Sequence, residues 1–535
     1  MKVALSRSLT RNFVGCGIVL ASCVVLWGCG GGDGGGGEQA IPLTVPKAAC
    51  GPNDHPETAL QGQVPAALRV PGGFQGFSCN LQLVGQSRGD GASWQHASFK
   101  DGAGHQCAYH DTASSTANRT HLGVVTVDLT NSSVPTPTTY LTSVGMLDPW
   151  ESLKVNPNRQ LLGATQATNG RGGPVLDLYD LSGDCRNPQL LASVAIGSTQ
   201  NGDAGALPQG GSLAGHEGAF APDGLTYYGG DRGTPIKYSA IDITNTTHPK
   251  LITTYTVPTA GTVAPASVIS HGLSISADGN RAYFTLDGDP GAGANLATFP
   301  PNNGIQIVDV SEIQARKDNP QVREISRLLW SDGSHAQHTI PVTIGGKAYL
   351  VAVDEGGPGG TSTSGTNGQK SCDAGLAPFP MARIIDISDE KNPTTASKLM
   401  LEIHNPKNCD KVLPDIVGLS SFTYGAHYCS VDNRVNATTL ACGYFESGIR
   451  VFDIRDPLRP KEIAYYNPPA VTTPSPGSQN NQTAATGRPD HCSAQVRLDV
   501  ATASLWTTCQ DNGLLVLRFT NGVWPFPEST AGLQN

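Results

Sequence analysis

One short pattern recurs through this chain: an apolar, β-branched run that ends in aspartate and is followed by turn residues. Successive copies are 52 to 77 residues apart, and a seventh copy has Arg518 in place of the aspartate. A short apolar run between turn residues is typical of a strand buried on both faces. Recurrence at this spacing predicts one structural module used seven times. The six aspartates are Asp128, Asp180, Asp242, Asp309, Asp386 and Asp453.

Each copy belongs to a longer unit of about four strands. In the fourth unit, HGLSIS and RAYFTL, joined by a turn at Ala277–Asn280, precede GIQIVD, and in the third PKLITTYTVP follows the run. Four twisted strands cannot bury both faces alone, so such units stack around a closed ring. We therefore predict an all-β fold, a seven-bladed β-propeller. We expect each aspartate to fix the turn after its strand through its side chain.

The seventh unit lacks a clear fourth strand. Its segments DHCSAQVRL, SLWTTCQ and GLLVLRFT end at Thr520, and the residues beyond form a poor strand. A strand-like segment, Phe77–Gln86, stands before the first unit without a blade of its own. We predict that it pairs beside Leu514–Phe519, completes the last blade and closes a propeller that occupies residues 50–535.

The first 29 residues resemble a bacterial lipoprotein signal peptide. A short apolar stretch at 13–28 follows three basic residues and ends in LWGC, which makes Cys29 the expected lipidation site. The box LASC, ending at Cys23, and an ordinary cleaved signal peptide are the alternatives. Residues 30–49 then form a Gly-rich tether and linker. We expect an exported protein held by a lipid at the periplasmic side or the cell surface. The basic residues are Lys2, Arg7 and Arg11.

Ten cysteines follow the signal segment, and none forms a CxxC pair. An even number in an exported chain predicts disulfides rather than a zinc site. Separations of 13 and 17 residues suit neighbouring strands of one hairpin, which predicts Cys429–Cys442 and Cys492–Cys509. Cys372–Cys409 is expected as a loop staple. The pairing of Cys50, Cys79, Cys107 and Cys185 stays open, with Cys50–Cys79 as one option.

The charge balance restricts the partners. The formal net charge is −9 and only 15% of the residues are charged, which argues against a nucleic-acid partner that requires a basic face. We therefore expect the ligand to be a protein or a small molecule. We expect contact with a membrane only through the lipid anchor.

The repeat strings IQIVD, RIIDI and RVFDI resemble the name-giving motif of the bacterial LVIVD-repeat propeller proteins. The N-terminal segments PETALQGQVP and SCNLQLVGQ are also similar to those of exported members of that family. The resemblance covers most of the chain from about Cys50. The resemblance implies the propeller fold, but it does not indicate any particular activity.

Several units place a polar residue at the head of their first strand, which is the innermost strand of a propeller blade. His216 and His271 each stand eight residues before the glycine of the following turn. We therefore expect a funnel in which polar side chains from all seven blades converge at one level. For the fifth blade His338 is preferred over its rival His335. The expected funnel residues are Gln95, Glu151, His216, His271, His338, His427 and His491.

Imidazoles that converge from separate blades suit a transition metal such as copper, zinc or iron. The five funnel histidines are the candidate ligands, with Glu151 or Gln95 as the nearest oxygen donor. The alternative is that each histidine bonds to the backbone at a tightly packed strand end. The cofactor is otherwise unknown from the sequence.

Two functions therefore remain open at this point. One is a binding scaffold for a protein or small ligand at the top face or in the funnel. The other is a metal-dependent, copper-like periplasmic oxidoreductase. No GxSxG, Walker or HExxH motif is present, so no catalytic residue is assigned.

Overall fold

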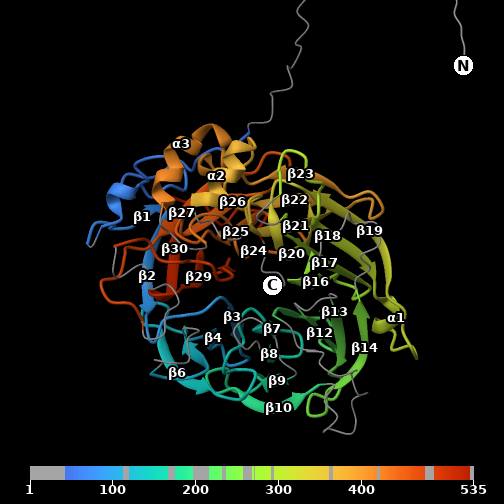
Figure 1. Ribbon diagram of the computed structural model, residues 1–535. Coiled ribbons are helices and arrows are strands. Elements are labelled where there is room, and N and C mark those ends of the chain that lie inside the picture. Colours follow the sequence, from blue (N-terminus) through green and yellow to red (C-terminus); the bar gives the residue numbers. More distant parts are fainter. Residues whose placement is uncertain are drawn as a thin grey trace, which may run out of the picture. The chain divides into compact units, whose positions relative to one another are not determined.

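In the computed structural model, seven antiparallel sheets of the described residues follow one another around a ring (Figure 1). The fold is the expected β-propeller, with one blade for each sequence repeat. The structure describes residues 43–70, 72–112, 120–166, 175–196, 216–231, 237–256, 268–269, 271–290, 294–360, 365–417, 422–475 and 487–529. The expected signal peptide with Cys29, and the first part of the tether, lie outside these residues.

The strands are numbered along the chain, and the first strand of each blade is the innermost. Blades one and two contain β3 (His96–Lys100), β4 (Gln106–Asp111), β5 (Val124–Asp128), β6 (Thr136–Leu141), β7 (Lys154–Asn156), β8 (Leu161–Thr165), β9 (Val175–Asp180) and β10 (Gln189–Ala195). Blades three and four contain β11 (Gly218–Phe220), β12 (Thr226–Asp231), β13 (Lys237–Asp242), β14 (Lys250–Thr256), β15 (Val268–Ile269), β16 (Leu273–Ile275), β17 (Arg281–Gly288), β18 (Asn303–Asp309) and β19 (Arg323–Trp330). Blade five contains β20 (Ser334–Ile344), β21 (Lys347–Gly356), β22 (Ala382–Asp386) and β23 (Thr394–Lys398). Blades six and seven contain β24 (Cys429–Val431), β25 (Thr439–Gly443), β26 (Ile449–Asp453), β27 (Lys461–Asn467), β28 (Arg497–Asp499), β29 (Ser504–Cys509) and β30 (Gly513–Phe519).

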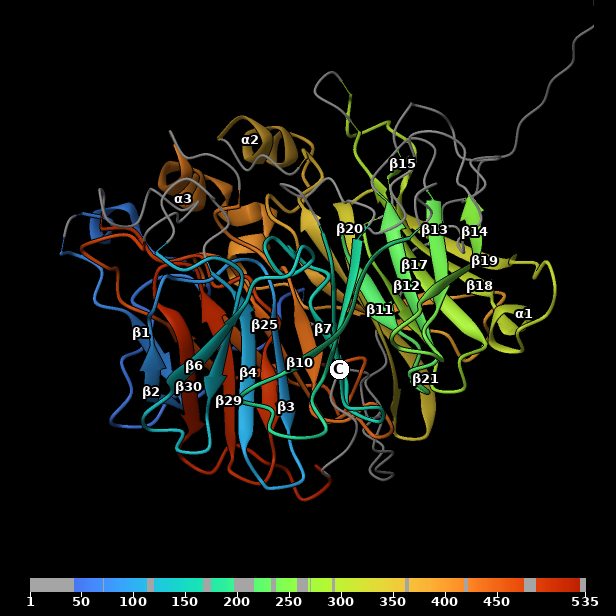
Figure 2. The ribbon, with the colours of Figure 1, turned by 90° about the horizontal axis from the view of Figure 1, so that it is seen from below.

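The helices of the described residues are short. They are α1 (Ser311–Gln314), α2 (Gly365–Asp373), α3 (Cys409–Val412) and the 3-10 turns η1 (Ala66–Leu68), η2 (Glu402–His404), η3 (Pro406–Asn408) and η4 (Leu413–Ile416). Helices α2 and α3 lie on one face of the ring (Figure 2). Among the described residues, no helix has both the length and the hydropathy needed to cross a membrane.

The N-terminal segment closes the ring, but it divides between two blades. Strand β2 (Leu81–Ser87) pairs with β30 and completes blade seven as predicted. Strand β1 (Phe77–Cys79) instead pairs with β27 as a fifth strand of blade six, which corrects the expectation that all of Phe77–Gln86 lies on the last blade. Asn80 separates the two strands with a φ of 56°, a left-handed conformation that asparagine tolerates. Figure 1 shows these blue strands beside the red ones.

The repeat aspartates have the structural role that the sequence predicts. Each is the last residue of the third strand of its blade. One carboxylate oxygen of each accepts a hydrogen bond from the backbone N–H two residues later, at 2.8–3.1 Å. The aspartate thus fixes the turn that leads to the outer strand. The donors are Thr130, Ser182, Thr244, Ser311, Ser388 and Arg455.

Five disulfides are formed by the ten described cysteines. Cys429 and Cys442 face each other on β24 and β25, and the bridge between residues 372 and 409 links α2 to α3. The pairings left open by the sequence include one bridge between blades one and two. Five disulfides indicate an oxidising compartment outside the cytosol, as expected of an exported protein. The pairs are Cys50–Cys79, Cys107–Cys185, Cys372–Cys409, Cys429–Cys442 and Cys492–Cys509.

We predict that the N-terminal strands carry much of the ring's stability. A chain that begins after Ser87 lacks β1 and β2 and leaves the edge of β30 unpaired. The free energy of unfolding should fall by about 5 kcal/mol, since each large buried apolar side chain such as Phe77 or Leu81 contributes roughly 1.5–3 kcal/mol. Urea unfolding followed by near-UV circular dichroism measures the change. A chain that begins at Leu43 is the control, and equal midpoints for the two chains would contradict the closure.

The aspartate turn gives a second prediction. Asp386→Ala removes the acceptor of the 2.8 Å bond from the Ser388 N–H and should lower the free energy of unfolding by about 1 kcal/mol. Asp386→Asn keeps an acceptor oxygen and should cost less than half as much. Thermal unfolding of the two variants checks this, and identical losses would show that the hydrogen bond is not the cause.

Candidate functional site

The heads of the innermost strands bring a cluster of polar side chains together around the propeller axis. We call these eight residues the hub cluster. Each is less than one-tenth exposed, so charges among them interact strongly. They come from blades two to six and are separated in the sequence by up to 276 positions. The hub cluster consists of Glu151, His216, Glu217, His271, Gln337, His338, Glu355 and His427.

Glu151 lies at the centre of the hub cluster. Its Oε2 is 2.9 Å from Nε2 of His216 and 3.2 Å from Nε2 of His271. Its Oε1 is 3.3 Å from Nε2 of His427. Burial raises the pKa of Glu151, but the neighbouring imidazoles outweigh burial and hold it well below the usual value.

His271 stands among three carboxylates. Its Nε2 is also 3.1 Å from Oε2 of Glu355, and its Nδ1 is 3.7 Å from Oε2 of Glu217. Burial lowers the pKa of His271, but Glu151 and the other two glutamates raise it to about 10. Burial likewise raises the pKa of Glu355, while His271 brings it to about 2. The three carboxylates around His271 therefore favour its protonated, positively charged form.

Glu217 connects the hub cluster with a deeper level of the channel. Its Oε1 accepts a hydrogen bond from Nζ of Lys154 at 3.1 Å and lies 3.3 Å from Nδ1 of His338. Burial raises the pKa of Glu217, and Lys154 and the histidines lower it more. Burial lowers the pKa of Lys154 and of His338, despite the favourable contact with Glu217.

His338 belongs to the hub cluster through its contact with Glu217, but Gln337 is the residue that contacts Glu151 and His427. Strand β20 has a register shift between Ala336 and His338, so Gln337 takes the place expected for the histidine. The Gln337 Nε2 group donates to Nε2 of His427 at 2.7 Å and to Oε1 of Glu151 at 3.4 Å. The rival His335 lies outside the hub cluster, since its Nδ1 is 2.6 Å from Oδ1 of Asp287.

Two further funnel residues are not part of the cluster. His491 lies with Glu446, 3.7 Å from Nε2 to Oε1, and contacts the ring of Phe445. The Oε1 of Gln95 accepts a hydrogen bond from the N–H of His96, so the amide caps the start of its own strand. The expectation of one polar residue per blade at a common level is therefore wrong for blades one and seven.

The five histidines do not form one ligand set. Within the described residues, the hub atoms that lie within 4.8 Å of one another belong to Glu151, His216 and His271. His427 is not part of this group of three. Its Nδ1 is 2.9 Å from the Ser493 carbonyl oxygen, and its Nε2 accepts a hydrogen bond from Gln337. The physical reason is that a seven-bladed ring is wide, and glutamates fill the space between the imidazoles.

Aromatic rings cover the strand-head side of the hub cluster. The ring centroids of Trp94 and Trp150 are 5.5 Å apart, and those of Phe422 and Phe445 are 5.0 Å apart. Trp150 packs 5.8 Å from His216, and Phe445 packs 4.9 Å from His427. Trp150, Phe422 and Phe445 have φ values of 50°, 63° and 45°, which cost strain in a bulky residue. This backbone strain turns the rings over the cluster.

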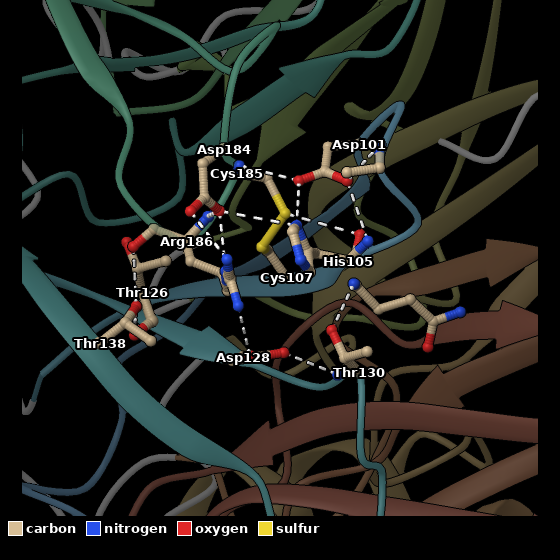
Figure 3. The surroundings of a disulfide bond; sticks show 12 residues. Asp101, His105, Cys107, Thr126, Asp128, Thr130, Thr138, Asp184, Cys185 and Arg186 are labelled. Atoms are coloured by element: carbon tan, nitrogen blue, oxygen red, sulfur yellow. Dashed lines mark hydrogen bonds and ion pairs between the residues drawn. A yellow bond between two sulfur atoms is a disulfide. The ribbon is translucent and has the colours of Figure 1, made fainter.

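A second group of possible ligands surrounds the Cys107–Cys185 disulfide and is structural instead (Figure 3). Asp101 accepts hydrogen bonds from the N–H groups of residues 103, 105 and 185 and lies 2.8 Å from Nδ1 of His105. Asp184 accepts two hydrogen bonds from the Arg186 guanidinium, which lowers the pKa of that carboxyl to about 2. These carboxylates fix the link between blades one and two.

Comparisons with solved structures find distant likenesses at about 10% sequence identity. No family model and no curated protein matches the chain. A periplasmic gluconolactonase of Pseudomonas aeruginosa is 10% identical, with 79% of this chain and 94% of that chain covered and a TM-score of 0.46. The β-propeller domain of Cps50 (Swd1) from Myceliophthora thermophila is 9% identical, with 82% and 100% covered and a TM-score of 0.46. No function follows from likenesses of this size.

Sequence reasoning missed three members of the hub cluster. Glu217 directly follows His216, and alternation along an extended strand places neighbouring side chains on opposite faces. Gln337 was hidden by the register shift. Glu355 lies near the end of β21, a second strand, where an inward side chain was not expected. The one signal in the sequence for Glu217 is an acidic residue directly beside a histidine at the head of a strand.

We predict that Gly272, next to His271, is required for this packing. An added Cβ would lie 1.9 Å from Oε2 of Glu217 and 2.4 Å from the Gln337 carbonyl oxygen. Gly272→Ala should therefore displace Glu217 and lower the free energy of unfolding by about 1–3 kcal/mol. Gly102→Ala is the matched control, since open space surrounds that position. Thermal unfolding measures both, and a Gly272→Ala variant as stable as the control would contradict the packing.

Proposed function

We propose that this protein is an exported propeller that binds one divalent transition-metal ion at its hub through Glu151, His216 and His271. The observation that carries the proposal is the convergence of the three buried ligand atoms from three blades. Neighbouring ligand atoms around an ion with bonds of about 2.0–2.2 Å lie about 2.8–3.1 Å apart in an octahedron and about 3.3–3.6 Å apart in a tetrahedron. The two imidazole nitrogens lie 2.9 and 3.2 Å from the shared carboxylate oxygen, close to these spacings.

The charge of the hub supports a dication. The hub cluster holds three buried carboxylates, Glu151, Glu217 and Glu355, and Lys154 is the lysine that pairs directly with one of them. With every imidazole neutral, as metal ligation requires, two negative charges remain, which one divalent ion neutralises. Without a metal, a protonated His271 neutralises one of these two charges. Glu355 Oε2, 3.1 Å from the His271 nitrogen, offers a further oxygen donor.

The two imidazoles and one carboxylate of the proposed site limit which metals it would bind. Two imidazoles and one carboxylate hold catalytic zinc and non-haem iron(II) in proteins, and imidazole also suits copper. The oxidoreductase hypothesis requires copper or iron at the hub, whereas zinc favours Lewis-acid chemistry or a structural role. The binding-scaffold hypothesis stands alone if the hub binds no metal.

We also propose that the chain is held at a membrane through a lipid on Cys29, at the periplasmic side or the cell surface. The five disulfides support the exported compartment. The N-terminal signal pattern supports the anchor.

Elemental analysis tests the metal proposal. We expect the purified protein, or the chelator-treated protein after exposure to zinc, copper, iron(II) or manganese in turn, to retain about one ion per chain. Binding of the preferred ion at about 100 times its Kd should stabilise the fold by about 2.7 kcal/mol. Glu151→Gln and His271→Ala should each weaken binding of that ion by at least tenfold, while remaining folded by circular dichroism.

His491→Ala is the matched control, because this histidine also heads an innermost strand but lies with Glu446. It should retain the ion with unchanged affinity. A protein that binds none of the four ions, or Glu151→Gln and His271→Ala variants that bind as tightly as the His491→Ala control, would overturn the proposal.

A further inference from the structure

A cavity of about 440 Å³ lies in the central channel, beyond the hub cluster. Residues of the inner strands of blades two to seven line it, and Glu217 and His338 belong both to this lining and to the hub cluster. Cavities of about 300–1,000 Å³ are typical of small-molecule sites. The cavity therefore has the size and the central position of a ligand site.

The wall of the cavity contains both apolar and basic side chains. Phe220, Ile275 and Tyr349 are among the apolar lining residues. The basic lining residues come from three different blades: Lys154, Arg434 and Arg497. Among the described lining residues, Glu217 is the one carboxylate, and it already accepts a hydrogen bond from Lys154.

Arg497 is a buried cation, and two of its hydrogen-bond acceptors are neutral oxygens. Its side chain is 2% exposed, and its Nη2 donates to the His96 carbonyl at 3.1 Å and to Oε1 of Gln495 at 2.8 Å. Burial, and then the nearby charge of Arg434, lower the pKa of Arg497. Two like charges placed beside one cavity repel each other, and an anion between them would relieve that repulsion.

We propose that this cavity binds a small organic anion, whose carboxylate or phosphate head lies at Arg434 and Arg497 and whose apolar body lies against the Phe220 and Ile275 side. Guanidinium groups bind both head groups through charge-assisted hydrogen bonds. The apolar wall adds affinity for a hydrocarbon or aromatic body. The inference goes beyond the metal proposal and does not depend on it.

Isothermal titration calorimetry of the chelator-treated protein tests the inference separately from metal binding. Three probes share one apolar chain: octanoate, octyl phosphate and the neutral octanamide. We expect at least one of the two anions to bind, and octanamide to bind at least tenfold more weakly. The anion that binds more tightly identifies the preferred head group.

Arg434→Gln and Arg497→Gln should each weaken anion binding by about tenfold or more, because each removes a charge-assisted hydrogen bond. Arg434→Gln is the decisive variant, since this half-buried side chain is less involved in packing than that of Arg497. Arg455→Gln is the control: that arginine pairs with Asp453 at the end of β26. Equal binding of octanamide and the anions, unchanged affinity in Arg434→Gln, or no binding of either anion up to about 10 mM would overturn the inference.

Discussion

Closure of the ring is the constraint on which the rest of the structure depends. A four-stranded blade exposes apolar surface on both faces, and only a neighbouring blade on each side covers it. The pairing of β2 with β30 supplies the last contact from the opposite end of the chain. Once the ring is closed, the heads of the innermost strands have a fixed distance from the axis. Residues as remote in sequence as Glu151 and His427 then become neighbours.

The electrostatics of the hub follow from that placement. Three carboxylates are buried where water cannot stabilise them, so each needs a cation nearby. Lys154 forms an ion pair with Glu217, whereas Glu151 and Glu355 both contact His271. The aromatic rings of Trp150 and Phe445 pack against His216 and His427, and the cavity lined by Arg434 and Arg497 shares Glu217 with the hub cluster. The proposed metal site and the proposed ligand cavity therefore adjoin at Glu217.

The sequence predicts the fold well because the repeat is encoded locally. An aspartate such as Asp242 fixes its own turn, and Cys429 and Cys442 face each other on adjacent strands. The hub is less predictable because it depends on register. A shift of one position in β20 exchanges His338 for Gln337, and the left-handed Asn80 moves Phe77–Cys79 to another blade. Glu355 reaches the axis from a second strand, which no local pattern indicates.

The most direct test of the central claim is an anomalous-scattering experiment on crystals of the protein, with data collected on both sides of the absorption edge of the metal found by elemental analysis. If the hub binds a metal as proposed, we expect one strong peak within about 2.0–2.2 Å of Nε2 of His216, Nε2 of His271 and a carboxylate oxygen of Glu151. A peak only at the surface group of Asp101, His105 and Asp184, or a hub in which His271 contacts its carboxylates without an ion in crystals soaked with the metal, would contradict it.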